Sequence, residues 1–266
     1  MLDKKQKYLQ IALNSTLSEA QRIISQIPQD KRIILEAGTP LIKEFGARAI
    51  RDIRFWWEAR VVGFGSTASS FQRTNAAFLN AMVESLEKQQ RRKAEVAIKR
   101  RKTKGEVLTP YIVADLKCMD RGVREVDIAF HGGANAAVAL GQAPIETLDS
   151  FIKECEKKNL DSMIDMMNVE FPLSILRQLK KLPQVIILHR GVDEESFNRE
   201  KEIPYHEIQR IKSNYDMLIS IAGGDTFREV QRAVFNDADI VVVWKSFYQG
   251  TGETAKLAER FLKEIR

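Results

Sequence analysis

Apolar and polar residues repeat with two different periods along this chain, and the two kinds of segment alternate. Short, mostly apolar runs predict strands, and longer stretches with apolar residues three or four positions apart predict helices. The predicted strands are residues 8–14, 32–38, 111–117, 135–140, 162–168, 185–190, 217–223 and 240–245. The predicted helices between and after them include residues 19–27, 145–158, 172–181, 227–236 and 253–266.

Several of the predicted strands are apolar on both faces, as strands of a parallel sheet between two layers are. Eight strand and helix units predict an α/β fold of the (β/α)8 TIM barrel type, in which chemistry lies at the carboxyl ends of the strands. An open, doubly wound sheet is the alternative, but its edge strands would need protection. We expect one barrel made of residues 1–54 and 109–266, with a helical, basic insertion at 55–108 between helix 2 and strand 3.

Composition adds limits to this picture. With 266 residues and 44% hydrophobic content, the chain can bury a sizeable core. It has no run of eighteen apolar residues and no charged-then-apolar leader, so we expect a soluble, cytoplasmic protein without membrane contact. Its two cysteines, Cys118 and Cys155, form no metal-binding or disulfide pattern. Cys118 could be a nucleophile, but we expect it to form the wall of a loop.

The most informative segment is the predicted strand at 111–117 and the residues after it. Side chains alternate along a strand, so Val113, Asp115 and Lys117 should share the barrel interior. Asp120 follows three residues later. A buried ion pair can be structural, although such pairs often cost more than they contribute. Three charges close together favour a catalytic site, where neighbouring charges shift pKa values and can hold a cation.

Polar residues also collect at the carboxyl ends of the other predicted strands, where they would share one rim of the barrel. They are Asn14, Glu36, Asp115, Lys117, Asp165, Asn168, His189, Arg190, Gly223, Gly224 and Lys245. Each has an ordinary structural explanation by itself, such as a hydrogen-bonded core histidine or a turn cap. Their common position favours function, because buried polar groups are costly without a partner.

Five segments of the chain resemble successive motifs of one known family. They are EAGTPLIK at 36–43, VADLKCMD at 113–120, MIDMMNV at 163–169, HRGVD at 189–193 and AGG at 222–224. In this order they resemble 3-hexulose-6-phosphate synthase, a member of the orotidine 5′-monophosphate decarboxylase superfamily. The resemblance implies a Mg²⁺-dependent aldolase that joins ribulose 5-phosphate to formaldehyde or splits the hexulose phosphate. It also implies a homodimer with shared active sites.

The resemblance suggests a role for each matching residue. Glu36 and Asp115 would hold Mg²⁺, which prefers carboxylate oxygens. Lys117 would stabilise the developing enediolate, and His189 would exchange protons. Asp120 would reach the partner subunit's site. The other residues expected to contact the substrate are Asn14, Asp165, Arg190, Gly223, Gly224 and Lys245.

Within that set, the phosphate would lie against the backbone amides near Gly223 and Gly224, because glycine allows close approach. Two departures from the family bear on the substrate. The first strand ends in Asn14 where the family usually has aspartate, and Trp244 stands where glycine is usual. Lys245 could compensate by contacting the phosphate. The resemblance to the sister decarboxylase of 3-keto-gulonate 6-phosphate is weaker, because Val192 stands where that enzyme has arginine.

The insertion at 55–108 has its own pattern. Phe78, Leu79, Met82, Val83 and Leu86 form an apolar helical stripe that needs a partner surface. Residues 88–104 contain nine Lys or Arg and one Glu, so they account for the chain's net charge of +6. Such a run can bind nucleic acid, but we favour a solvated helix face, since no aromatic residue interrupts the run. The insertion should join the barrel at the face opposite the chemistry.

Two classes of function remain open at this point. The first is an aldolase of this type, or a relative with another sugar phosphate. The second is a non-catalytic barrel that binds partners through its basic insertion. Barrels host many chemistries, so the fold alone does not decide between them. The retained acidic and basic residues favour the enzyme.

Overall fold

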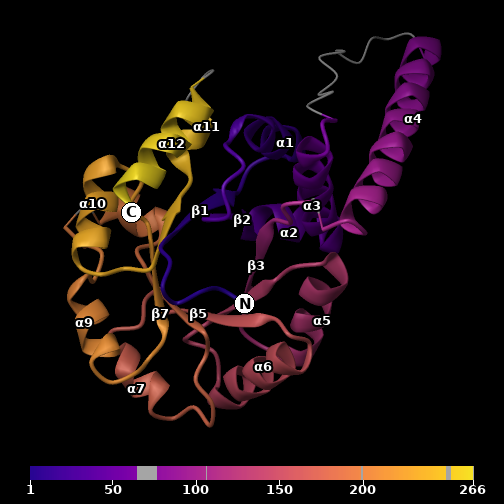
Figure 1. The fold of residues 1–266 in the computed structure, drawn as a ribbon. Coiled ribbons are helices and arrows are strands. Elements are labelled where there is room, and N and C mark those ends of the chain that lie inside the picture. The colour runs from indigo at the N-terminus through magenta and orange to yellow at the C-terminus, as the bar shows by residue number, and fades with distance from the viewer. Residues whose placement is uncertain (65–76, 106, 199, 250–252, 266) are drawn as a thin grey trace.

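A computed structural model describes residues 1–64, 77–105, 107–198, 200–249 and 253–265, apart from the side chains of 77–83 and 249. Eight parallel strands form a closed barrel, with helices around its outside (Figure 1). The strands are β1 (Tyr8–Leu13), β2 (Ile33–Ala37), β3 (Tyr111–Cys118), β4 (Ala136–Leu140), β5 (Asp161–Asp165), β6 (Val185–His189), β7 (Leu218–Ala222) and β8 (Ile240–Val243). The helices are α1 (Leu17–Gln26), α2 (Thr39–Phe45), α3 (Ala47–Val61), α4 (Ala77–Lys102), α5 (Gly122–Gly132), α6 (Ile145–Lys157), α7 (Pro172–Leu176), α8 (Val192–Phe197), α9 (His206–Lys212), α10 (Phe227–Phe235), α11 (Lys245–Gln249) and α12 (Thr254–Glu264).

The TIM barrel and all eight strands predicted from the sequence are confirmed. Each strand pairs in parallel with its neighbour, and β1 closes the barrel against β8 with Tyr8 opposite Ile240. Among the strands, the largest difference is β5, which was expected to run to residue 168 but ends at Asp165. The chain turns there, because a carboxylate oxygen of Asp165 accepts the backbone N–H of Met167 at 2.9 Å.

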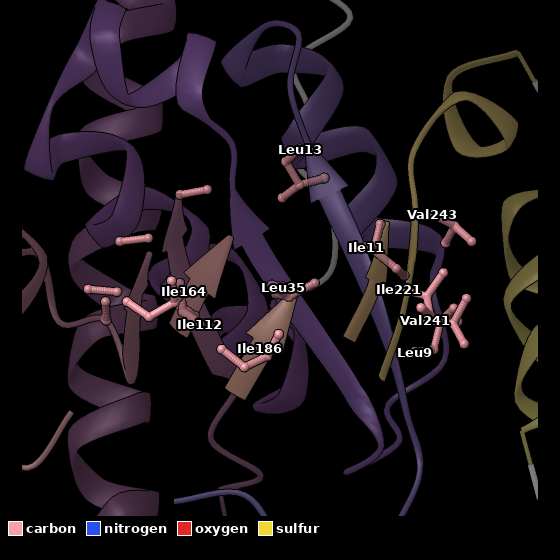
Figure 2. Close-up of a cluster of buried hydrophobic side chains, with 14 of the residues drawn as sticks. Leu9, Ile11, Leu13, Leu35, Ile112, Ile164, Ile186, Ile221, Val241 and Val243 are labelled. Atoms are coloured by element: carbon pink, nitrogen blue, oxygen red, sulfur yellow. The ribbon is translucent and has the colours of Figure 1, made fainter. Parts of the chain in front are cut away.

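Alternation along the strands creates two hydrophobic layers. Ile34, Val113 and Met163 belong to a cluster inside the barrel. Leu9 and Ile11 of β1 belong to a second cluster between the strands and the helices, part of which Figure 2 shows. Each strand is therefore covered on both faces, which explains why runs such as β8 have few polar residues.

Helix starts follow local signals in the sequence. Thr16 precedes α1, and its hydroxyl accepts the backbone N–H of Glu19 at 3.2 Å. Thr226 precedes α10 and forms a reciprocal capping box with Glu229. These caps satisfy amides that have no partner within the helix, and they hold the loops at the carboxyl end of the barrel in place.

The region expected as an insertion divides into two parts. The boundary at residue 54 falls inside α3, and Trp57 of this helix is buried, so residues 55–61 belong to the helical layer of the barrel. The additional helix is α4. Arg91 pairs with Asp52 at 3.1 Å and Lys102 pairs with Glu58 at 2.7 Å, which fixes its carboxyl-terminal half to α3.

The amino-terminal half of α4 projects away from the barrel (Figure 1). The side chains of Phe78, Leu79, Met82 and Val83 lie outside the described residues, and Leu86 is 50% exposed. Most of the basic side chains from 88 to 104 are exposed, so the solvated and the polyanion-binding interpretations both stay predictions. Among the described helices, none is both long and apolar enough to cross a membrane.

Candidate functional site

The site lies where the apolar interior of the barrel ends. On four strands an ionisable residue follows two positions after an interior apolar side chain, and alternation directs it to the same side. These residues are Glu36, Asp115, Asp165 and His189. All four line a cavity of about 420 Å³. The carboxyl ends of the strands therefore hold a group of charges above a hydrophobic floor, as expected for a barrel of this type.

Asp165 connects the two basic residues of the site. Its Oδ2 lies 2.8 Å from Lys117 Nζ and 2.8 Å from His189 Nδ1. Lys117 Nζ also lies 3.2 Å from Asp115 Oδ2. The Asp165 side chain is 2% exposed. The four residues form one continuous network, so a change in the charge of one alters the others.

These contacts determine the charge states. Burial raises the pKa of Asp165, but His189 and Lys117 lower it by more, so this carboxylate stays ionised. Burial lowers the pKa of Lys117, and the nearby carboxylates Asp115 and Asp165 raise it above its ordinary value. Burial also lowers the pKa of His189, but Asp165 raises it by more, so the pKa lies above its ordinary value. The site thus holds a fixed ammonium and an imidazole that gains protons readily.

Lys117 reaches this position through an irregular backbone. The sequence predicted that Asp115 and Lys117 share a face by simple alternation, and their contact confirms the shared location. However, Lys117 has a φ of +46° and the pairing between β3 and β4 shifts between Ala114 and Cys118. A lysine with positive φ is unusual and costs backbone energy. The bulge rather than regular alternation directs the ammonium into the network.

Glu36 and Asp115 form an acidic pair at the edge of this network. A carboxylate oxygen of Glu36 accepts a hydrogen bond from Gln10, and Thr39 donates to Asp115 Oδ2 at 2.9 Å. Burial and the charge of Asp115 raise the pKa of Glu36 to about 7. Asp115 Oδ1 is buried and has no hydrogen-bond partner in the part of the chain that the structure describes. A divalent cation would contact this oxygen and reduce the repulsion between the two carboxylates.

The donor set is small for a metal. In the part of the chain that the structure describes, no group of three or more His, Cys, Asp or Glu side chains is arranged to hold an ion. Mg²⁺ often binds to one or two carboxylates and completes its shell with water and substrate oxygens. Glu36 and Asp115 therefore fit a Mg²⁺ ion that shares its coordination with a substrate.

The opposite side of the cavity is made by strands β6 to β8. Arg190, Gly223, Gly224 and Lys245 line it, as the sequence analysis expected. Gly223 has a φ of +92°, and a side chain there would overlap the backbone of Arg190. Arg190 Nη2 donates to the Gly223 carbonyl at 2.8 Å. Glycine is therefore required at 223 for the close approach of the loops after β6 and β7.

Asn14 and Asp120 have different positions relative to this cavity. Asn14 lines it, and its side chain lies against Gly38, where a Cβ atom would overlap it. Asp120 is exposed and borders a separate surface hollow with Arg121 and Arg124. Within one chain Asp120 is thus outside the cavity, and its expected role in a partner's site stays a prediction.

Several cavity residues were missed by the sequence analysis. Gln10 is polar in the middle of an apolar strand, and this exception could have identified it. Thr39 belongs to the EAGTP segment but was given no role. Glu195 and Asp225 follow β6 and β7 within loops and short helices, where nothing in the local pattern distinguishes them from surface acids.

Cys118 lies beside the site without the properties of a nucleophile. Its thiol is buried, and burial raises its pKa to about 11. A thiol with this pKa is neutral near pH 7, whereas the thiolate is the nucleophilic form. Cys118 instead packs in the wall of the loop after β3, as expected from the sequence, and its thiol donates to the Asp120 carbonyl at 3.2 Å.

Comparison with known proteins finds relatives that are bifunctional Fae/Hps enzymes. The chain is 32% identical over 263 residues to the bifunctional enzyme Fae/Hps of Methanocella arvoryzae, which covers 97% of this chain and 53% of the relative. The chain spans about half the length of the curated relatives it matches.

Solved structures share the fold. The 3-hexulose-6-phosphate synthase from Salmonella typhimurium has a TM-score of 0.69 at 21% identity, covering 97% of this chain and 98% of that chain. The 3-keto-L-gulonate-6-phosphate decarboxylase from Vibrio cholerae has a TM-score of 0.65 at 16% identity, with 98% and 97% covered. Residues 79–259 match the family described as orotidine 5′-phosphate decarboxylase / HUMPS. This match includes more than half of the chain, which therefore belongs to the orotidine 5′-phosphate decarboxylase / HUMPS family.

Proposed function

We propose that this chain is an aldehyde-lyase of the 3-hexulose-6-phosphate synthase type, which interconverts D-arabino-3-hexulose 6-phosphate with ribulose 5-phosphate and formaldehyde. The observation that carries the proposal is the network of Asp115, Lys117, Asp165 and His189 inside one cavity. Such a network suits proton removal next to a carbonyl group, because it provides a proton acceptor and a fixed positive charge. The similarity to the Fae/Hps enzymes supports the same reaction.

In the synthetic direction, a base removes a proton from C1 of ribulose 5-phosphate and leaves an enediolate. His189 suits this step, because Asp165 holds Nδ1 and leaves Nε2 for proton exchange. The enediolate carbon then forms a bond to the carbon of formaldehyde, and the formaldehyde oxygen takes up a proton. Cleavage is the reverse of these steps.

Lys117 has a different task. Its ammonium is held by Asp115 and Asp165 and keeps its proton, because its pKa is raised. A preorganised positive charge stabilises the negative oxygen of the enediolate more than the neutral carbonyl of the substrate. Lys117 therefore acts on the transition state without exchanging a proton.

Mg²⁺ would be held by Glu36 and Asp115. When bound, it would supply positive charge near the substrate oxygens and relieve the repulsion between the two carboxylates. Gln10 and Thr39 hold these carboxylates in place through their hydrogen bonds. The phosphate of the substrate would lie at the side formed by Arg190, Gly223, Gly224 and Lys245.

We also propose a homodimer in which Asp120 contributes to the partner's site. The support is its exposed position, outside the cavity of its own chain, within the same VADLKCMD segment that supplies Asp115 and Lys117. A residue placed this way can contact a substrate only across an interface between two chains.

The direct test is the formaldehyde-dependent loss of ribulose 5-phosphate, measured with Mg²⁺ and again with excess chelator. We expect turnover that requires both formaldehyde and Mg²⁺. Absence of any formaldehyde-dependent loss with Mg²⁺ present would contradict the proposed reaction, and full activity in chelator would contradict the metal.

A further inference from the structure

Carboxylates contact both cations, Arg190 and Lys245, that line the β6 to β8 side of the cavity. Glu195 Oε2 lies 2.6 Å from Lys245 Nζ. Arg190 Nη2 lies 3.3 Å from Glu229 Oε1 and 4.0 Å from Glu195 Oε1. The two cations that would receive a phosphate are therefore already paired with carboxylates of the chain itself.

Asp225, the third carboxylate at this side, is held firmly by the backbone. Its side chain accepts hydrogen bonds from the amides of Trp244 at 2.8 Å, of Ser246 at 3.3 Å and of Lys245. The Ser246 hydroxyl also donates to the Asp225 carbonyl at 2.6 Å. These bonds join the loop after β7 to the end of β8. They fix the backbone from which the Lys245 side chain extends.

Glu195 is held in a different way. It belongs to the six-residue helix α8, and its side chain is 32% exposed. Its carboxylate contacts long, flexible side chains rather than backbone amides. Glu195 can therefore leave Lys245 for solvent at a smaller cost than Asp225 can leave its amides, because water replaces its partner.

Among the described residues, two buried donors at the same side have no hydrogen-bond partner. They are Arg190 Nε and Trp244 Nε1, and both residues line the cavity. A buried N–H group without an acceptor is unfavourable. A phosphate group offers several acceptor oxygens, so it can satisfy donors that a single carboxylate cannot reach together.

We propose that Glu195 is a specificity-determining residue that pairs with Lys245 in the free protein and is displaced by the phosphate of the substrate. This inference rests on the proposed function, since it takes the phosphate to bind at this side of the cavity. In this exchange Lys245 loses the Glu195 carboxylate and gains the phosphate, which has more acceptor oxygens and more negative charge. A ligand without phosphate cannot make this exchange, so Lys245 does not contribute to its binding.

The first test measures the binding of inorganic phosphate by calorimetry, which needs no turnover. Glu195→Gln keeps the shape of the side chain and removes the competing charge, so we expect the Kd for phosphate to fall by about tenfold or more. The matched control is Glu200→Gln, which removes the same charge from an exposed position that does not line the cavity. Equal affinities for the two variants, or no phosphate binding by any of the proteins, would overturn the proposal.

The second test asks whether the gain passes through Lys245. In the Lys245→Gln background, Glu195→Gln should change phosphate affinity by less than about twofold, because the exchanged partner is gone. Thermal melts of all variants establish that each is folded. If Glu195→Gln gives the full gain in phosphate affinity without Lys245, then Glu195 only repels the phosphate, and the proposed exchange of partners at Lys245 is wrong.

The third test separates this inference from the proposed reaction. In the aldolase assay, Glu195→Gln should lower KM for ribulose 5-phosphate while kcat stays within about twofold, as expected for a change in uniform binding. Binding of unphosphorylated ribulose should not change. An inactive protein that still shows the phosphate gain would refute the reaction and support the exchange. An active protein in which Glu195→Gln does not increase phosphate affinity would support the reaction and refute the exchange.

Discussion

Strand β5 carries a buried aspartate at each end, and the two have different partners. Asp161, at the amino end, is 2% exposed and accepts hydrogen bonds from the Tyr111 hydroxyl at 2.5 Å and the Leu2 amide at 3.1 Å. Asp165, at the carboxyl end, is 1% exposed and contacts Lys117 and His189. Asp161 contacts a neutral hydroxyl and a neutral amide, whereas Asp165 contacts an ammonium and an imidazole.

This difference in partners, more than burial, distinguishes Asp161, which has a structural role, from Asp165, for which we propose a role in catalysis. At the amino end, Tyr111 keeps its proton, because burial and Asp161 raise its pKa well above the ordinary value. At the carboxyl end, the partners of Asp165 are His189, which can exchange a proton, and Lys117, whose ammonium can stabilise a negatively charged oxygen. Residue type and burial are the same, so the chemistry comes from the neighbours.

The largest expected effect is on turnover at the carboxyl end. Lys117→Ala should lower kcat by about a hundredfold or more, because it removes a preorganised charge that acts in the transition state. Circular dichroism and thermal melting would establish that the variant folds. A folded variant with normal turnover would remove Lys117 from the mechanism and weaken the contrast between the two ends.

The two aspartates can be compared directly through His189. In Asp165→Asn the carboxylate that raises the pKa of His189 is lost and burial still lowers it, so this pKa should fall. The imidazole should then titrate at lower pH in NMR spectra. Asp161→Asn is the control at the other end of the strand and should leave the titration unchanged. An unchanged His189 titration in Asp165→Asn would show that another group sets its charge.

Glu36 should respond to metal in a way that the amino end does not. Glu36→Gln removes one of the two carboxylates proposed for Mg²⁺, so the Mg²⁺ concentration needed for half-maximal activity should rise by about tenfold or more. The measurement is activity against free Mg²⁺. The same Mg²⁺ requirement in the variant and the unchanged protein would exclude Glu36 as a ligand.

The smallest effect on turnover is expected from Tyr111→Phe. Loss of the hydroxyl leaves Asp161 with fewer donors in a buried place, so the free energy of unfolding should fall by about 1–3 kcal/mol. Turnover should stay within about twofold. Urea unfolding and the aldolase assay measure the two quantities on the same protein. A large loss of kcat with unchanged stability would reverse the assignment of the two ends.

Only one side of the contrast between the ends of β5, the position of Asp165, could be predicted from the sequence. Strand ends in a parallel barrel meet at one rim, so the position of Asp165 near Lys117 and His189 could be predicted from the pattern of strands. The fold was predictable for the same reason, because eight similar units leave few alternatives.

Other parts of the site depend on backbone detail that periodicity does not contain. The bulge at Lys117 changes the local geometry, but the strand contains no glycine from which this bulge could be predicted. The pairing of Glu195 with Lys245 joins helices α8 and α11, which are distant in sequence. Such contacts follow from three-dimensional packing, and a pattern of apolar residues says nothing about which surface acid reaches which cation.

The pairing of β1 with β8 has a consequence for how the chain reaches this structure. Tyr8 is made long before Ile240, so one edge of β1 stays unpaired until β8 has been made. Closing so long a loop is slow, because its entropy must be lost before the strands gain their hydrogen bonds. Exposed edges in the meantime can pair with other chains. The step most open to aggregation during biosynthesis is therefore the last one, when the barrel closes.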